Sequence, residues 1–145
     1  MEPLSVEEIR RTVALALAED IGSGDVTTLA AVPETAKAKA AMCARESLVV
    51  SGIALAEAAF RELAPDVQIT RVAEDGQHVA EGKPLLHVAG PARALLSAER
   101  VALNFLQRLS GVATATAQFA GLVKGTRARI LDTRKTTPGW RRFEK

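Results

Sequence analysis

The chain has 145 residues, of which 48% are hydrophobic and 25% are charged, and its net charge is +2 at pH 7. These proportions are typical of one soluble globular domain and exclude a disordered chain. The one cysteine excludes an internal disulfide and a multi-cysteine metal site. No stretch approaches the roughly 20 apolar residues that span a bilayer, and the acidic N-terminus is unlike a signal peptide. We therefore expect a cytoplasmic protein with no membrane partner.

The charge is divided unevenly along the chain. Residues 1–90 contain 8 basic and 14 acidic residues, a net charge of −6, whereas residues 91–145 contain 11 basic and 3 acidic residues, a net charge of +8. This asymmetry indicates a nucleic acid or a small polyanion as the partner of the last third, unless the basic surface is simply solvated. The chain has four Phe, one Trp and no Tyr, too few aromatic residues for a single-stranded nucleic acid site. We expect no nucleic acid partner.

The first ninety residues alternate between helical and strand patterns. Ser5 and Glu8 form a capping box, which predicts a helix from there to about Ala18. Two glycines and two aspartates then predict an ordered turn over 19–28. Further along, period-2 alternation, apolar runs and helical spacing predict a strand over 35–44, a strand over 48–52, a helix over 53–63, a strand over 67–72, and short strands joined by glycine turns over 74–90.

The last third is predicted to be mainly helical. Apolar residues at helical spacing predict a helix over 93–109, and Ser110 and Gly111 then predict an interruption. The elements expected after the interruption are a helix over 114–123, a short strand over 129–132, and a helix that begins near Trp140.

The stretch from Asp132 to Gly139 holds the most informative polar residues. Thr133, Arg134 and Lys135 follow the predicted strand directly, and two more threonines come next. A guanidinium binds a carboxylate or phosphate through two parallel hydrogen bonds, lysine adds a compact charge, and hydroxyl groups add neutral donors. Loops at strand ends are common ligand sites. The stretch is therefore either an anion site or an exposed basic turn.

A second polar group lies on the predicted helix over 93–109. Arg100, Asn104 and Arg108 are four residues apart, so they share one face of that helix. Such a stripe is usually a solvated face. The functional interpretation is a second cationic wall for the same ligand.

Some isolated polar residues have simple structural interpretations. His78 and His87 lie in separate predicted strands without nearby carboxylates, so we expect no metal site there. Cys43, in a predicted strand, is expected to be a small buried residue. Asp25 is expected to cap a turn or a helix.

Three stretches of the chain resemble the quinolinate phosphoribosyltransferase family, whose members are also called carboxylating nicotinate-nucleotide pyrophosphorylases. The stretches are SAERVALNFLQRLSGVAT over 97–114, DTRKTTPG over 132–139, and the ED-G-GD-TT pattern over 19–28. The motifs over 97–114 and 132–139 are specific, and the similarity extends over essentially the whole chain.

The resemblance implies a reaction and a set of substrate-binding residues. Quinolinate and phosphoribosyl pyrophosphate would give nicotinate mononucleotide, pyrophosphate and carbon dioxide, a pentosyl transfer of de novo NAD biosynthesis. Arg134 would bind a quinolinate carboxylate, with Thr133 and Lys135 beside it, and Lys135 could also face the phosphates. Arg100 would reach into the site of a partner subunit, because the family forms its sites at a homodimer interface. Both substrates are polyanions, which suits this basic residue set.

The resemblance also implies the architecture. The fold class is expected to be α+β, with an N-terminal α/β sandwich domain over 1–109, which includes its long connecting helix, and the truncated start of an α/β barrel over 110–145. Mg²⁺ is the implied cofactor, but the family's metal ligands and its acid and base groups lie beyond Lys145. No catalytic residue and no metal ligand can therefore be assigned. We expect little or no turnover by this polypeptide alone, measured as release of labelled carbon dioxide from quinolinate.

Three other interpretations stay open. One is the molybdenum-locus paralogue of the same family, whose substrate is not defined. Another is a non-catalytic lipoyl- or biotinyl-like binding module, because the glycine-turn rhythm over 75–90 is typical of such domains. Lys83, next to Pro84, is a poor site for attachment of the prosthetic group. The third is a non-catalytic remnant of the family.

Overall fold

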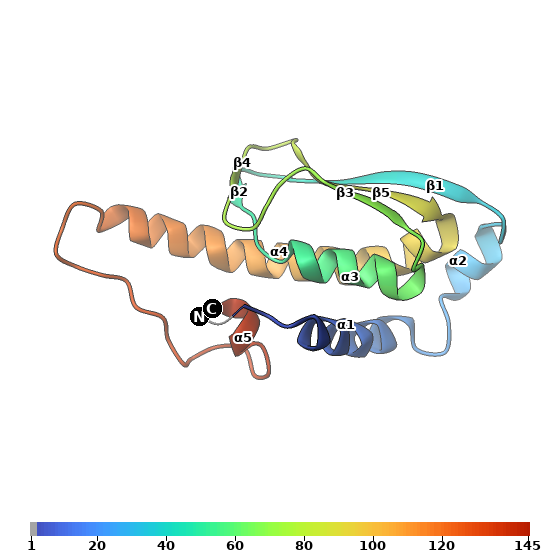
Figure 1. Ribbon diagram of the computed structural model, residues 1–145, viewed down its shortest axis with the longest axis horizontal. Coiled ribbons are helices and arrows are strands. Elements are labelled where there is room, and N and C mark those ends of the chain that lie inside the picture. The colour runs from blue at the N-terminus through green and yellow to red at the C-terminus, as the bar shows by residue number, and fades with distance from the viewer. Residues whose placement is uncertain (1–2) are drawn as a thin grey trace.

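The computed structural model describes residues 3–145. In chain order its elements are α1 (Val6–Ile21), α2 (Val26–Ala31), β1 (Lys37–Cys43), β2 (Leu48–Val49), α3 (Ile53–Leu63), β3 (Gln68–Arg71), β4 (His78–Val79), β5 (Pro84–Pro91), α4 (Ala92–Leu122) and α5 (Arg141–Glu144). Figure 1 shows three layers, with the strands on one side, α3 and α4 in the middle, and α1 on the other side. The expected α+β class is confirmed.

The strands form two antiparallel sheets. In the larger sheet β5 lies between β1 and β3, and β2 pairs with β4 in the smaller one. One face of the larger sheet packs on α4, where β5 contributes the buried Leu86 and Val88. The predicted alternation in β1 is confirmed for its lysines, because Lys37 and Lys39 are exposed while Ala38 is half-buried.

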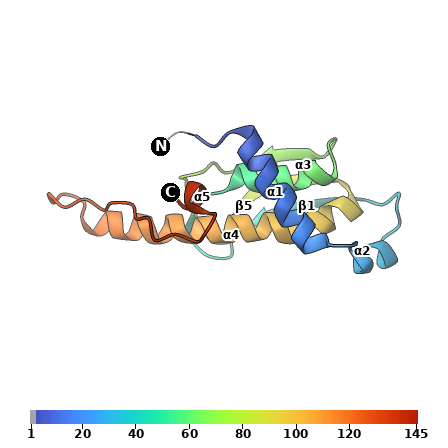
Figure 2. The same cartoon turned by 90° about the horizontal axis from the view of Figure 1, so that it is seen from below.

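The α1 helix begins as predicted. The Ser5 hydroxyl accepts a hydrogen bond from the Glu8 N–H at 3.2 Å, and the Glu8 carboxylate accepts one from the Ser5 N–H at 2.8 Å. The helix ends at Ile21, three residues later than predicted, and the unexpected helix α2 begins within the predicted turn and continues to Ala31. Figure 2 shows α1 crossing the α3 and α4 layer, with α2 beyond its end.

The α3 helix occupies the predicted residues and approaches α4 closely at its N-terminus. Gly52, the residue before the helix, has a φ of 101°. A Cβ atom there would lie 3.0 Å from Leu109 Cδ1 and 3.4 Å from the Phe105 carbonyl oxygen. Both the backbone conformation and the space at this position therefore require glycine.

Replacement of Gly52 by alanine is expected to lower the free energy of unfolding by about 2 kcal/mol, because it adds left-handed strain and a close contact with α4. Urea denaturation measures the change. Gly111→Ala is the control: Gly111 lies inside α4 and a Cβ atom there would contact nothing, so stability should stay the same or rise by up to about 1 kcal/mol. Equal effects of the two substitutions would contradict this account of Gly52.

The predicted interruption of the long helix is wrong. The α4 helix continues through Ser110 and Gly111. The Ser110 side chain is buried, and its hydroxyl accepts a hydrogen bond from the Ser51 N–H at 3.0 Å and donates one to the Ser51 carbonyl at 3.3 Å. The backbone of Ser51, distant in sequence, thus satisfies the hydroxyl of Ser110. The helix is therefore not interrupted at this serine, although its residue type predicts a break.

Two other predictions need correction. Residues 129–132 form no strand, since no strand among residues 3–145 lies beside them to pair with. They belong to a long connection that leads away from the sheets and returns to α5 (Figure 1). Cys43 is exposed, whereas we expected it to be buried.

The far end of α4 extends beyond the three layers (Figure 1). Phe119 and Leu122 on this end of the helix are 60% and 80% exposed, and Leu131 in the following connection is 81% exposed. This part of the chain therefore presents an uncovered apolar surface, whereas the first 18 residues of α4 contribute to the core.

Candidate functional site

The residues Asp132–Thr137, here called the cationic loop, lie on the surface after α4. The Thr133, Arg134 and Lys135 side chains are all exposed. The Lys135 N–H donates to the Thr133 hydroxyl at 3.0 Å, so the backbone turns locally between them. Within residues 3–145, no hydrogen bond or ion pair engages the charged groups of Arg134 or Lys135. The loop therefore presents two cations that are available to a ligand.

Helix α5 and the residue after it fix the backbone of this loop. Lys145 pairs with Asp132 at the start of the loop, and Arg141 donates to the Arg134 carbonyl at 3.2 Å in the middle. At the end of the loop, the Thr137 N–H and hydroxyl donate to Glu144 at 3.1 and 2.7 Å. The Lys145 ammonium also lowers the pKa of Asp132.

Glu144 joins this assembly to α4. The Arg108 guanidinium donates to its carboxylate through Nε at 3.0 Å, and the Glu144 side chain is only 7% exposed. Hydrogen bonds from Thr137 and Arg108 lower the pKa of Glu144 to about 2. The Glu144 carboxylate is therefore ionised at neutral pH and bound by both Arg108 and Thr137.

An aromatic contact lies near this cluster. Trp140 stacks on Phe105 of α4 with ring centroids 5.3 Å apart.

Arg100, the other predicted substrate-binding residue, lies in a separate cluster. Its Nε atom donates to both carboxylate oxygens of Asp20, at 3.1 and 3.0 Å, and its Nη2 atom lies 3.6 Å from Asp25. The Asp20 carboxylate, through its hydrogen bond and its charge, raises the pKa of Arg100. The Arg100 side chain is still 52% exposed. It is thus oriented by carboxylates and remains accessible to a ligand.

Asp25 has the capping role that its sequence context indicated. Its carboxylate accepts hydrogen bonds from the Thr28 N–H at 3.2 Å and the Thr28 hydroxyl at 2.8 Å, at the start of α2. The Ser97 hydroxyl donates to it at 3.0 Å. These hydrogen bonds, led by that of the Thr28 hydroxyl, lower the pKa of Asp25.

The expected stripe on α4 divides between two clusters. Arg100 faces Asp20 and Asp25, Arg108 faces Glu144, and Asn104 between them is exposed. Residues eight apart in a helix are separated by about 12 Å along its axis. Because Arg108 anchors the end of the cationic loop, Arg100 and the loop lie at different positions along α4. Among residues 3–145, no hydrogen bond or ion pair joins Arg100 to Thr133, Arg134 or Lys135.

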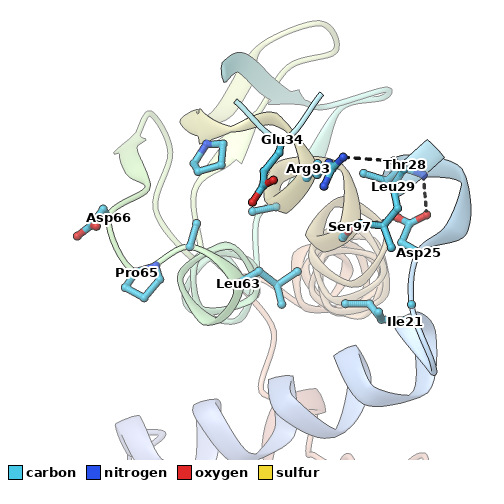
Figure 3. Close-up of a pocket in the computed structure, with 14 residues that line it drawn as sticks. Ile21, Asp25, Thr28, Leu29, Glu34, Leu63, Pro65, Asp66, Arg93 and Ser97 are labelled. Atoms are coloured by element: carbon cyan, nitrogen blue, oxygen red, sulfur yellow. Dashed lines mark hydrogen bonds between the residues drawn. The ribbon is translucent and has the colours of Figure 1, made fainter. Parts of the chain in front are cut away.

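A cavity of about 620 Å³ lies beside the Arg100 cluster, between α2 and the adjoining ends of α3 and α4, and Asp25 and Ser97 are among its lining residues (Figure 3). Its lining is mostly apolar, with Ile21, Leu29 and Leu63 among the contributors. The one cation in its lining, Arg93, donates to the carbonyls of Val32 at 2.8 Å and Leu29 at 3.3 Å. Among the described residues, the cavity thus offers no unpaired cation to an anionic ligand.

Neither a metal site nor a membrane helix is found in the described part of the chain. No group of three His, Cys, Asp or Glu side chains in residues 3–145 could hold a metal ion. The Mg²⁺ that the resemblance implies therefore stays a prediction. No helix in the same range is long and apolar enough to cross a bilayer.

Sequence reasoning missed the acidic partners of the basic residues. Asp20 lies 80 residues before Arg100, and Glu144 lies 36 residues after Arg108. The only available signal for Asp20 was its place in the motif over 19–28. Glu144 belonged to no motif considered, so nothing in its local sequence indicated its role.

Comparison with protein families gives two adjoining matches. The model described as "Quinolinate phosphoribosyl transferase, N-terminal domain" matches residues 25–110, and the corresponding C-terminal domain model matches residues 112–145. The first match includes the glycine-turn region over 75–90. The predicted domain boundary at 109/110 stays a prediction, and it lies inside the continuous helix α4.

Curated proteins and solved structures give the same result. The chain is 42% identical to the chloroplastic nicotinate-nucleotide pyrophosphorylase [carboxylating] of Oryza sativa subsp. japonica over 95% of this chain and 37% of that protein. The Mycobacterium leprae (strain TN) protein of the same name is 40% identical over 94% and 49%. The crystal structure of NadC from Streptococcus pyogenes superposes with a TM-score of 0.93 and 36% identity, covering 99% of this chain and 51% of that one. The chain thus spans about half or less of the length of these relatives.

Proposed function

The chain belongs to the quinolinate phosphoribosyltransferase family, and from this premise we propose that it provides the quinolinate-binding part of a phosphoribosyltransferase site. One observation carries the proposal: the cationic loop is fixed at both ends while the charged groups of Arg134 and Lys135 have no partner in residues 3–145. Preorganised, unpaired cations favour a dianion because little ordering remains to be done on binding.

Each loop residue has a distinct task in this proposal. Arg134 binds one quinolinate carboxylate through two parallel hydrogen bonds. Thr133 accepts from the Lys135 N–H, which leaves its hydroxyl proton for the ligand. Lys135 supplies a compact charge that suits either the second carboxylate or the phosphates of phosphoribosyl pyrophosphate.

The proposed site is shared by two subunits of a homodimer. Arg100 and the cationic loop lie at different positions along α4 with no contact between them, so one ligand would not reach both within a single chain. Arg100 is exposed and oriented by Asp20 and Asp25, as suits a residue that serves the site of a second copy. The mass of the chain in solution tests the proposed homodimer. Twice the mass of one chain is expected, and the mass of a single chain would contradict it.

The reaction proposed for the whole protein is phosphoribosyl transfer with decarboxylation. The quinolinate ring nitrogen bonds to C1 of the phosphoribosyl group as the bond from C1 to the pyrophosphate oxygen breaks. The bond between ring C2 and its carboxylate then breaks, carbon dioxide leaves, and C2 takes up a proton. The basic residues of this chain bind and orient the two polyanions. The names of relatives from Nicotiana, quinolinate phosphoribosyltransferase [decarboxylating], support quinolinate over another substrate.

The same evidence bears on the alternatives. A lipoyl- or biotinyl-like module is not supported, because the region over 75–90 lies within the match to the family's N-terminal domain. We place the protein in the cytoplasm as part of this proposal, on the strength of a free, exposed Cys43 and a bacterial relative. Related plant proteins are named as chloroplastic or mitochondrial.

Calorimetric titration of quinolinate into the chain tests the proposed function, with nicotinate as the matched ligand that lacks one carboxylate. Quinolinate should bind at least about tenfold more tightly, because a charge-assisted hydrogen bond contributes about 1.5–3 kcal/mol. Equal affinities for the two ligands, or no binding of quinolinate, would contradict the proposal.

A further inference from the structure

Helix α5 and the residue after it support the cationic loop through hydrogen bonds and an ion pair. Consecutive residues hold the two ends of the loop: Glu144 binds Thr137, and Lys145 pairs with Asp132. Helix α5 is in turn fixed to the rest of the chain, because Trp140 just before it stacks on Phe105 of α4 and Arg142 donates to Glu8 of α1 at 3.2 Å. Movement of α5 would therefore move the loop.

Glu144 contacts both the loop and α4, and Arg108 of α4 also donates directly to the Thr137 hydroxyl at 2.7 Å, so the three side chains form one hydrogen-bonded cluster. One carboxylate oxygen accepts from Arg108 and from the Thr137 hydroxyl, and the other accepts from the Thr137 N–H. At 7% exposure this carboxylate has little access to solvent or to a ligand. Charge-assisted hydrogen bonds of this kind fix both distance and direction.

The charges around Glu144 also suit a residue that supports the loop without binding the ligand. A carboxylate beside an anion site would repel a dianionic ligand if it were unpaired. Here the Arg108 guanidinium neutralises Glu144. The two charges that remain on the loop, those of Arg134 and Lys135, are thus available to the ligand.

We propose that Glu144 is a positioning residue for anion binding: by holding Thr137 against Arg108 it fixes the direction in which the loop presents Arg134 and Lys135. Glu144 itself does not touch the ligand. This inference rests on the proposed function, since quinolinate is the anion expected at the loop.

The substitution Glu144→Gln tests the inference. Glutamine keeps the size of the side chain but turns an amide donor toward donors of Arg108 and Thr137. Quinolinate binding, measured by calorimetry, should weaken about tenfold, and trypsin should cut after Arg134 and Lys135 about tenfold faster. Emission of Trp140, the one tryptophan of the chain, and far-UV circular dichroism should stay unchanged, so that a loss of folding is not the cause.

Controls separate this inference from the proposed function. Glu46→Gln makes the same charge change at an exposed residue between β1 and β2, and should change neither readout. If Glu144→Gln fails to fold, Thr137→Val removes the hydroxyl contacts with Glu144 and Arg108 but keeps the contact of the Thr137 N–H with Glu144. It should give a smaller change, about threefold, in the same direction. Failure of wild-type chain to bind quinolinate would overturn the proposed function, whereas wild-type cleavage rates in a folded Glu144 or Thr137 variant would overturn the role of Glu144.

Discussion

Replacement of Arg134 by alanine is expected to weaken quinolinate binding by at least about 30-fold. The substitution removes a bidentate charge-assisted contact, which contributes about 2 kcal/mol or more to affinity. Arg134→Lys should restore only part of the affinity, because an ammonium carries the charge without the planar pair of donors. Titration calorimetry at constant salt measures both variants.

The matched control for this prediction is Arg45→Ala. Arg45 is exposed, lies just after β1, and loses the same charge on substitution. A general effect of net charge would weaken binding equally in both variants. If Arg134→Ala binds quinolinate as well as Arg45→Ala does, Arg134 is not a ligand-binding residue.

Replacement of Phe105 by alanine is expected to lower the free energy of unfolding by about 4 kcal/mol. Phe105 is 2% exposed in the core and carries the stacking contact with Trp140. The variant loses both a buried aromatic side chain, at about 3–5 kcal/mol, and the ring contact, at about 0.5–1.5 kcal/mol. Urea denaturation followed by circular dichroism measures stability, and Trp140 emission should shift to the red as the ring becomes more hydrated.

Phe119→Ala provides the comparison within the same helix. Phe119 is 60% exposed, so its loss should change stability by no more than about 0.5 kcal/mol. A loss for Phe105→Ala below 1.5 kcal/mol, or an unchanged Trp140 emission, would mean that this contact does not fix α5.

Local sequence signals predicted most of the secondary structure. The apolar spacing of the helix over 53–63 lies within its own eleven residues, and its stop signal, Pro65, follows two residues later. The capping box at Ser5 needs only the four residues from Ser5 to Glu8. The errors arose where distant residues decide the outcome. Ser110 stays helical because Ser51 satisfies its hydroxyl, and residues 129–132 have no neighbouring strand, which a β conformation requires, among residues 3–145.

The candidate site likewise has some features that local sequence predicts and others that depend on residues distant in the chain. Residue types left Thr133, Arg134 and Lys135 as either an anion site or an exposed basic turn, because carboxylate and phosphate ligands select such donors but solvent also accommodates them. Their role in binding stays a prediction. The sequence could not show which arginines already have partners. Arg100 and Arg108 both pair with carboxylates distant in the chain, so the basic excess of the last third is partly neutralised in the folded protein.

The most direct test of this account is a crystal structure of the chain with quinolinate bound. It should show a carboxylate of the ligand within hydrogen-bonding distance of the Arg134 guanidinium, with Lys135 beside it and Arg100 of the partner subunit facing the same ligand. Quinolinate bound in the cavity between α2, α3 and α4, away from the cationic loop, would contradict the account.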